Sequence, residues 1–278
     1  MTVHAALRTV TLESRRSGEL ARLLERRGLV AIEAPSLREV PLANQTDAFA
    51  FGDALRAGQC EVLVLLTGVG TRALLDALAT QRPRDEVLAA IAGLTLCCRG
   101  PKPVAVLKEL GLRPSVTAPE PNTWRELVAA MASMDLAGKQ VWVQEYGRPS
   151  LDLAAALRAR GAVLHSAAVY AWQLPEDLGP LERAIDQLCA GEAEVVAFTA
   201  GQQVEHLLLV AERRGKGAVL HDALRTRVAV ASIGPVTSEV LREHGLLPDL
   251  EPEHSKMGHL AKIVAERGVE ILARKRGE

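Results

Sequence analysis

Two Gly-Pro segments, 134 positions apart, constrain the fold of this chain more than any other feature. Each follows a short apolar run, and each precedes a helix-like stretch that ends at a glycine. Agreement of a turn, a helix pattern and a glycine stop in one register predicts an internal duplication, so we read the chain as two copies of one unit. The matched pairs are Gly100 with Gly234, Pro101 with Pro235, Leu107 with Leu241, Glu109 with Glu243, Gly111 with Gly245 and Pro114 with Pro248.

The rest of the chain keeps nearly the same spacing, since Gly28 pairs with Gly161 and Thr67 with Thr199. Each copy reads as strand–helix–strand, helix, strand–Thr–helix and strand–Gly-Pro–helix, and Thr237 or Ser238 opens the last of these helices in the second copy. The strands are continuous apolar runs, which is typical of parallel sheets covered by helices on both faces. The predicted class is therefore α/β with right-handed crossovers.

Two stretches at equivalent points of the copies break this rhythm. Residues 35–41 and 167–175 alternate polar and apolar side chains and end at prolines, which is typical of linker strands and not of core strands. Two linkers at equivalent points predict that the chain leaves one domain, builds another and returns to the first.

Bulk composition narrows the classes of partner. The chain has 33 basic and 34 acidic residues, so we expect no nucleic acid as a partner. The four cysteines show neither metal-ligand spacing nor a paired framework, and we expect no metal and a reducing, cytoplasmic location. No signal-peptide pattern is visible and no apolar run approaches the ~18–20 residues that span a bilayer, so no membrane association is expected.

The strand-to-helix turns carry the most chemistry. In open parallel sheets, ligands bind at the carboxyl ends of the strands, where helix N-termini direct free N–H groups outward. Four such turns, two in each copy, supply N–H groups and hydroxyls that suit carboxylates or phosphates: Thr67-Gly68, Gly100-Pro101, Thr199-Ala200 and Gly234-Pro235-Val236-Thr237. Alternatively, Thr67, Thr199 and Thr237 are simply N-caps. Cationic side chains near the same strand ends are Arg15, Arg72, Lys102, Arg148 and Lys256.

A nucleotide-dependent enzyme is a further alternative. The segment 68–73 fits G-x-G-x-x-A after a strand. However, we interpret that strand as not the first of its domain, and the acidic residues about twenty positions on, Asp85 and Glu86, fall in a proline-rich loop. No nucleophile motif is present, and the seven histidines are scattered singly.

Several segments, taken in order, resemble the uroporphyrinogen-III synthase family over nearly the whole chain. The motifs are individually loose, but their order and spacing are fairly specific. They are Val143-Gln144-Glu145-Tyr146-Gly147, Val169-Tyr170-Ala171-Trp172, Phe198-Thr199-Ala200, residues 233–241 with Gly245-Leu246 behind them, and Lys256-Met257-Gly258.

The resemblance implies two flavodoxin-like α/β domains joined by a two-stranded linker, with the active site in the inter-domain cleft. One domain would be discontinuous, so that the sequence repeat and the spatial domains are out of phase. The implied boundaries are 1–36 plus 174–278 for the first domain, 42–167 for the second, and 37–41 and 168–173 for the linker strands.

The resemblance also implies an activity. Hydroxymethylbilane, a linear tetrapyrrole with eight carboxylates, would lose water and close to uroporphyrinogen III with inversion of ring D. No cofactor or metal is implied, and a monomer suffices. Tyr170 matches the family tyrosine thought to assist departure of the hydroxyl. The residues expected to bind substrate are Ser14, Arg15, Thr67, Gly68, Gly100, Lys102, Gly147, Arg148, Thr199, Ala200, Gln202, Gly234, Thr237 and Lys256.

Two departures from the family pattern leave an alternative open. Pro103 and Val236 stand where some relatives carry a hydroxyl residue, which favours a non-catalytic, tetrapyrrole- or anion-binding regulatory module of the same fold. Retention of Tyr170 and Thr237 favours the enzyme.

Overall fold

In the computed structural model the chain divides into two compact units, and the structure describes residues 6–14, 18–41, 45–145 and 149–277. Unit 1 comprises Met1–Arg38 and Gln173–Glu278, and unit 2 comprises Glu39–Trp172. Each unit contains a parallel sheet between layers of helices, which confirms the predicted α/β class.

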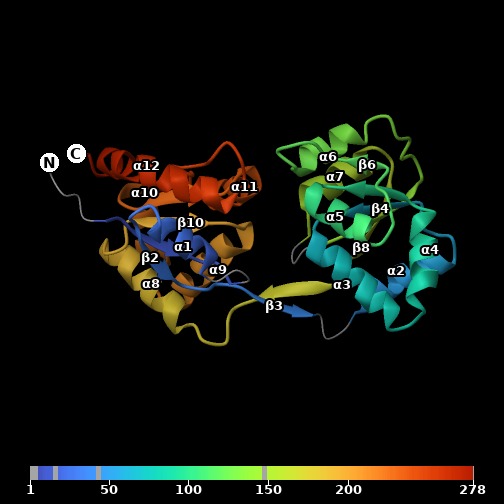
Figure 1. Cartoon of the computed structure of the whole chain (residues 1–278), viewed down its shortest axis with the longest axis horizontal. Helices are drawn as coiled ribbons and strands as arrows, with labels where there is room; N and C mark the ends of the chain where they lie inside the picture. Colours follow the sequence, from blue (N-terminus) through green and yellow to red (C-terminus); the bar gives the residue numbers. More distant parts are fainter. Residues whose placement is uncertain (1–5, 15–17, 42–44, 146–148, 278) are drawn as a thin grey trace. The chain divides into compact units, whose positions relative to one another are not determined.

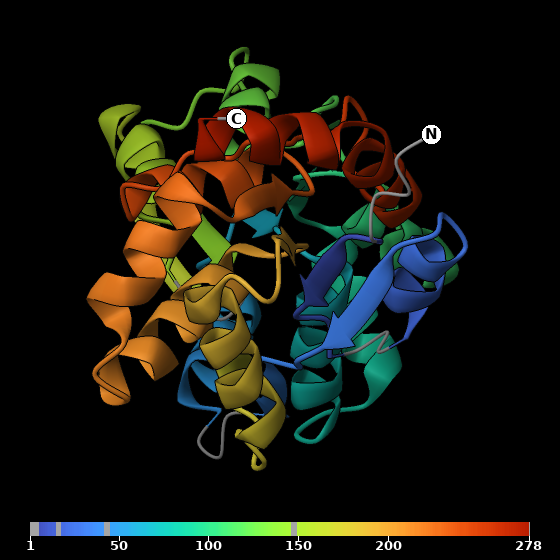
Figure 2. The ribbon, with the colours of Figure 1, turned by 90° about the vertical axis from the view of Figure 1, so that its left-hand side faces the viewer.

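Unit 1 is built on a parallel sheet with the strand order β11-β10-β1-β2. Its strands are β1 (Arg8–Thr11), β2 (Val30–Glu33), β10 (Val195–Phe198) and β11 (Ala229–Ser232). A bridge from Ala231 to Leu250 adds a fifth position at the β11 edge. One face packs against α8 (Gly179–Ala190), α9 (Gly201–Arg213), α10 (Gly217–Thr226) and α11 (Pro235–Glu243). The other face packs against α1 (Glu19–Glu25) and α12 (Met257–Arg276), so that in Figure 2 the orange helices and blue α1 lie on opposite sides of the sheet.

Unit 2, several of whose helices and strands are labelled in Figure 1, repeats this architecture. Its strand order is β6-β5-β4-β7-β8, again parallel. Its strands are β4 (Val62–Leu65), β5 (Thr95–Cys98), β6 (Val116–Thr117), β7 (Gln140–Gln144) and β8 (Val163–Ala167). The helices α2 (Thr46–Arg56), α3 (Gly68–Ala79), α4 (Arg84–Ala92) and α5 (Pro101–Glu109) contribute to the core on one face. On the other face lie α6 (Trp124–Ala130) and α7 (Leu151–Ala159).

A separate two-stranded sheet pairs β3 (Arg38–Pro41) with β9 (Tyr170–Gln173). The Arg38 guanidinium donates to the Gln173 amide oxygen (3.1 Å) and to Glu176 (2.7 Å). The division between the two units falls inside these strands, whereas the sequence prediction sets them apart as linkers at 37–41 and 168–173.

The two units correspond element by element, which explains the repeat in the sequence. Strands β10, β11, β1 and β2 of unit 1 take the places of β4, β5, β7 and β8 of unit 2. However, β1 and β2 come from the first copy and β10 and β11 from the second, so each unit combines parts of both copies. The same spatial order therefore arises from two permuted chain orders.

Strand residues alternate between the two cores of each unit because successive side chains of a strand point to opposite faces. Val196 and Phe198 enter the core beneath α8–α11, whereas Val195 and Ala197 enter the core beneath α1 and α12. Phe198 is fully buried, and burial of such a side chain contributes about 1.5–3 kcal/mol to stability. The strands are therefore apolar throughout, as the sequence predicts.

Two helices differ from the sequence prediction. Helix α11 begins at Pro235 with Gly234 as its N-cap, and not at Thr237 or Ser238. Proline is favoured in the first helical turn because its missing N–H needs no partner there. Helix α4 covers Asp85 and Glu86, which the sequence analysis wrongly assigned to a loop.

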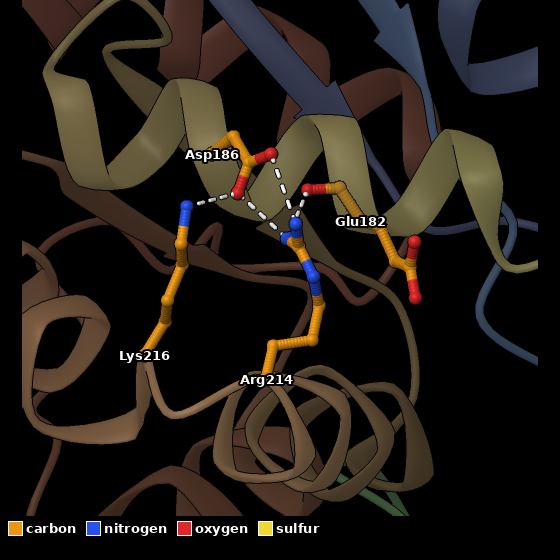
Figure 3. Close-up of polar contacts among 4 residues, drawn as sticks. All are labelled: Glu182, Asp186, Arg214 and Lys216. Carbon is orange, nitrogen blue, oxygen red and sulfur yellow. Dashed lines mark hydrogen bonds and ion pairs between the residues drawn. The ribbon is translucent and has the colours of Figure 1, made fainter.

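A charged cluster holds α8 to the turn between α9 and α10 (Figure 3). Arg214 donates to Asp186 (2.6 and 3.2 Å) and to the Glu182 carbonyl (3.0 Å), and the Lys216 ammonium lies 2.5 Å from Asp186. Hydrogen bonds from Arg214 and then Lys216 hold the pKa of Asp186 at about 2. The carboxylate of Asp186 thus joins three segments of unit 1.

Candidate functional site

The strand order of each sheet identifies where a ligand would bind. In unit 1 the chain first adds β2 on one side of β1 and later adds β10 and β11 on the other side, so the strand order switches between β1 and β10. In unit 2 it switches in the same way between β4 and β7. The carboxyl ends of such strand pairs are the usual ligand sites of open α/β sheets. The turns and helix starts that follow β4 and β10 carry five of the predicted binding residues, which are Thr67, Gly68, Thr199, Ala200 and Gln202.

In unit 1 this edge carries a network of three polar side chains. Gln203, buried in the first turn of α9, accepts hydrogen bonds from the backbone N–H of Thr199 (2.7 Å) and of Ala200 (3.3 Å). Its amide nitrogen donates to the Leu12 carbonyl (3.3 Å), to Glu13 Oε1 (3.2 Å) and to Thr199 Oγ1 (3.0 Å). The Thr199 hydroxyl donates to the same Glu13 oxygen. The two N–H groups predicted to bind an anion are therefore already bonded within the chain.

The second turn of unit 1 is tightly packed. Gly234 has an extended backbone, and its N–H donates to Ser232 Oγ (3.4 Å). A Cβ at Gly234 would overlap Ser255 Oγ, so close packing explains the glycine. Ser238 donates to Ser232 Oγ (2.8 Å) and lies in hydrogen-bond contact with Glu251. Thr237 is buried in the first turn of α11.

In unit 2 the equivalent edge is filled by Gln144 at the end of β7. Its Oε1 accepts the Thr67 N–H (3.3 Å), and its amide nitrogen donates to the Glu145 carbonyl. Gln144 is fully buried, and a Cβ at Gly70 would overlap its amide. A Cβ at Gly68 would lie 2.8 Å from the Lys102 carbonyl oxygen, so the turns after β4 and β5 lie side by side.

Glu145 follows Gln144 and is 8% exposed. Burial raises the pKa of its carboxyl to about 7, although the Ser150 N–H (3.2 Å) and the positive charge of Arg99 act in the opposite direction. Glu145 therefore carries a carboxyl that exchanges its proton near neutral pH.

The structure brings together some of the predicted site residues but describes only part of the set. Thr199, Ala200 and Gln202 share one turn of unit 1, and Thr67, Gly68 and Lys102 share one edge of unit 2. Ser14 lies after β1, where its hydroxyl accepts the Leu37 N–H (3.0 Å). Tyr170 is the first residue of β9. The N-caps of α5, α11 and α12 are Gly100, Gly234 and Lys256. Arg15, Gly147 and Arg148 lie outside the described residues.

The alternative that three threonines are N-caps holds for one of them. Thr67 caps α3, because its hydroxyl accepts the Gly70 N–H (3.0 Å). Thr199 precedes the N-cap of α9, which is Ala200, and Thr237 lies inside α11. Aligned on β4 with β10 and on the starts of α3 and α9, Thr67 corresponds to Ala200, so the Thr67–Thr199 pairing is wrong by one residue.

The strand before the G-x-G-x-x-A segment at 68–73 differs in position from the prediction. Strand β4, which precedes Gly68, is the first strand of its sheet in chain order, contrary to the sequence analysis. The site is nevertheless filled, since the Gln144 amide occupies the space beside Gly70. The glycines of this segment are explained by packing against the chain itself.

Sequence reasoning missed the four residues that organise the two edges: Glu13, Gln144, Glu145 and Gln203. One signal was available, because Gln203 stands three positions after the N-cap of α9, the spacing of a capping box. Of the other three, Gln144 is the last residue of β7, Glu145 follows it, and Glu13 comes soon after β1, but their roles depend on neighbouring elements.

One groove of unit 1 lies elsewhere, along α9 and α10. It has a volume of about 820 Å³ and includes His206, His221 and Glu212. His206 is bonded to the Ser36 carbonyl (2.6 Å) and is buried. Within the described residues no group of three metal-ligating side chains is poised to hold a metal ion. Among the described helices, none has the length and hydrophobicity needed to cross a bilayer.

Comparison with known proteins gives one consistent result. The family model for uroporphyrinogen-III synthase HemD matches residues 18–262. An uncharacterized protein, YjjA of Bacillus subtilis (strain 168), is 31% identical over 261 residues, which cover 91% of this chain and 94% of the relative.

Two crystal structures of uroporphyrinogen III synthase from the extremely thermophilic bacterium Thermus thermophilus are similar in fold. A mutant in its Form-1 crystal is 27% identical, with a TM-score of 0.70 and coverage of 97% of this chain and 100% of the other. The wild type in its Form-2 crystal is 29% identical, with a TM-score of 0.57 and coverage of 95% and 99%.

Proposed function

Because the chain belongs to the uroporphyrinogen-III synthase family, we propose that it catalyses the cyclisation of hydroxymethylbilane to uroporphyrinogen III. The observation that carries this proposal is the family match over residues 18–262, which includes the central strands β4 and β10 of both units and the turns after them. The enzyme would act as a lyase in tetrapyrrole biosynthesis.

The reaction requires positioning more than strong acid or base catalysis. The electrons of a pyrrole nitrogen expel the hydroxyl group, which leaves as water after it takes up a proton. The substituted carbon of ring D then attacks, and a spiro intermediate fragments and closes with ring D inverted. Spontaneous closure without inversion competes, so the enzyme must hold ring D in the productive geometry, and such positioning can supply several kcal/mol.

We assign roles to residues as follows. The phenol of Tyr170 assists the departing hydroxyl. The turns that begin at Thr67, Gly100 and Gly234 bind carboxylates of the substrate, with Lys102 and Lys256 as nearby cations. The nearly identical backbone angles of Gly100 (φ 167°, ψ −169°) and Gly234 (φ 165°, ψ −178°) support equivalent use of the two Gly-Pro turns.

A coupled assay tests the proposal. Hydroxymethylbilane is generated in situ, the purified protein is added, and the oxidised products are separated into type I and type III isomers. We expect predominantly type III product above the control without protein. Only type I product from folded protein would contradict the proposal and favour the non-catalytic binding module.

Replacement of Tyr170 by phenylalanine tests its role within this assay. We expect Tyr170→Phe to lower kcat about 10- to 100-fold, at the lower end of a general-acid contribution. An unchanged rate would remove Tyr170 from the mechanism and leave the cyclisation itself intact.

A further inference from the structure

The edge of unit 1 at the carboxyl ends of β1 and β10 presents a hydrogen-bond acceptor. Glu13 Oε1 receives the Thr199 hydroxyl and the Gln203 amide (3.2 Å). Within the described residues Glu13 Oε2 accepts no hydrogen bond and forms no ion pair. Glu13 is half-buried just beyond the end of β1, and Thr199 and Gln203 fix its side chain.

Three of the donors described at this edge are already used. Gln203 Oε1 accepts both the Thr199 and the Ala200 N–H groups, and the Thr199 hydroxyl is directed to Glu13. A ligand carboxylate that contacted Glu13 would be repelled by its charge, and the Thr199 and Ala200 N–H groups are not free to compensate. A ligand group that contacts Glu13 must therefore donate a hydrogen bond or carry positive charge.

The substrate class proposed above contains both kinds of polar group, because a tetrapyrrole carries pyrrole N–H donors as well as carboxylates. We propose that Glu13 accepts a hydrogen bond from a pyrrole N–H of the substrate and stabilises the positive charge that develops on that ring when water leaves. The inference rests on the proposed function and adds Glu13 to the residues that act on the substrate. No proton moves to Glu13. The C–O bond breaks, the oxygen leaves as water with a proton from the Tyr170 phenol, and the ring nitrogen keeps its hydrogen.

The duplicated position in unit 2 does not offer the same acceptor. Glu145 follows β7 as Glu13 follows β1, but Glu145 is buried, and its Oε2 receives the Ser150 N–H. Gln203 and Thr199 hold Glu13 in place, so they are positioning residues for it. A charge-stabilising group of this kind acts mainly on the transition state because the positive charge is absent from the bound substrate.

Two variants separate charge from hydrogen bonding. Glu13→Gln keeps an acceptor oxygen and loses the charge, and Glu13→Leu loses both. The matched control is Glu33→Gln, which removes a carboxylate from the exposed end of the neighbouring strand β2. In the coupled assay we expect Glu13→Gln to lower kcat about 10- to 100-fold with little change in KM, which is smaller than the loss of one oxyanion-hole donor. Glu33→Gln should keep the wild-type rate.

Anaerobic binding of uroporphyrinogen III, measured by isothermal titration calorimetry, tests the acceptor without turnover. We expect Glu13→Leu to weaken binding about tenfold, near the upper end of the effect of one hydrogen bond between neutral groups, while Glu13→Gln keeps the acceptor oxygen and stays within about twofold. Thermal melting shows whether each variant is folded, and kcat per folded molecule separates a structural role from the proposed one.

The coupled assay and the binding measurement together distinguish the proposed cyclisation from the proposed role of Glu13. If the wild type binds uroporphyrinogen III through Glu13 but yields no type III isomer, the acceptor stands and the proposed cyclisation fails. If the wild type yields type III isomer and both Glu13 variants behave like Glu33→Gln, the cyclisation stands and the Glu13 inference is overturned. Absence of both binding and turnover in the wild type overturns both.

Discussion

Both units use a glutamine as the acceptor for backbone N–H groups of an equivalent turn, but the glutamine comes from a different element in each unit. Each must satisfy backbone N–H groups at the turn between its central strand and the next helix. In unit 1 Gln203 of α9 accepts them, and the neighbouring strand end carries Leu12. In unit 2 the helix position equivalent to Gln203 is Gly70, and Gln144 at the end of β7 supplies the acceptor. The buried acceptor is thus retained although its source has moved.

The glutamates after these strands differ in burial. Glu13 is half-buried and bonded to two side chains, whereas Glu145 is 8% exposed beneath the start of α7. An internal duplication therefore keeps residue type and place, while the surroundings decide how deeply each carboxyl is buried. The following changes disturb this correspondence and are ordered by expected effect. Because Trp124, Trp142 and Trp172 all lie in unit 2, tryptophan fluorescence reports its unfolding selectively.

The largest effect concerns Glu145. Its pKa is raised in the folded chain to about 7 from 4.5, so the folded state binds more protons than the unfolded state between these values. The resulting stability is complete below pH 4.5 and is lost as pH rises through 7, a change of about 3 kcal/mol for this shift. Glu145→Gln should remove this loss. Urea unfolding at pH 5 and pH 8.5 measures it, and parallel pH curves for wild type and variant would contradict the burial effect.

Moving the glutamine of unit 2 from β7 to α3 should have the next largest effect on the free energy of unfolding. Gly70→Gln alone overlaps the Gln144 amide, and we expect a loss of about 2 kcal/mol from overpacking. Gln144→Leu alone leaves the Thr67 N–H without its acceptor, which costs about 1–3 kcal/mol. The double variant reproduces the arrangement of unit 1 and should recover most of this loss.

The exchange is measured as a double-mutant cycle by urea unfolding with tryptophan fluorescence. A coupling energy of about 2 kcal/mol is expected for residues in direct contact. Additive losses would show that the helix cannot supply the acceptor in unit 2, and that the two arrangements are not interchangeable.

Some features of this chain could be predicted from its sequence, and others could not. The Gly-Pro turns and the apolar strands were predictable because each is a local signal of a few residues. Gln144 and Gly70 lie 74 positions apart, and their relation depends on the space between β7 and α3. The burial of Glu145 likewise depends on packing that no local pattern contains. Sequence reasoning therefore located the edges of the sheets but not the side chains that fill them.

Substitutions at the N-caps of α3 and α9 should have a smaller effect on the free energy of unfolding. Thr67→Ala removes the hydroxyl that accepts the Gly70 N–H and should cost about 1 kcal/mol. Ala200→Ser places a hydroxyl at the equivalent position of unit 1, where Gln203 already accepts the Ala200 N–H, and should change stability by less than about 0.5 kcal/mol. Tryptophan fluorescence follows the first variant and thermal circular dichroism the second. A gain of about 1 kcal/mol from Ala200→Ser would show that Gln203 is a poor substitute for a cap.

The smallest effect concerns Asp186 of α8 and its counterpart Asp53 of α2. Asp186 joins Arg214 and Lys216 across segments, whereas Asp53 bonds Arg56 of its own helix (2.7 Å). The pKa of Asp186 is lowered to about 2, so its contribution is present above the ordinary carboxyl range near pH 4 and is lost as pH falls through 2. Asp186→Asn should cost up to about 1 kcal/mol at pH 7, since the carboxylate is 42% exposed and solvent screens the pair.

The pH dependence and the matched variant Asp53→Asn decide whether the cluster acts as a clamp. The difference between wild type and Asp186→Asn should vanish near pH 2 in thermal circular dichroism. Asp53→Asn should stay within about 0.5 kcal/mol of wild type, as expected for an exposed pair within one helix. Equal losses from both variants would mean that the contacts across segments add nothing to the ordinary surface pair. The two units would then differ at their strand ends but not in how α8 and α2 are held.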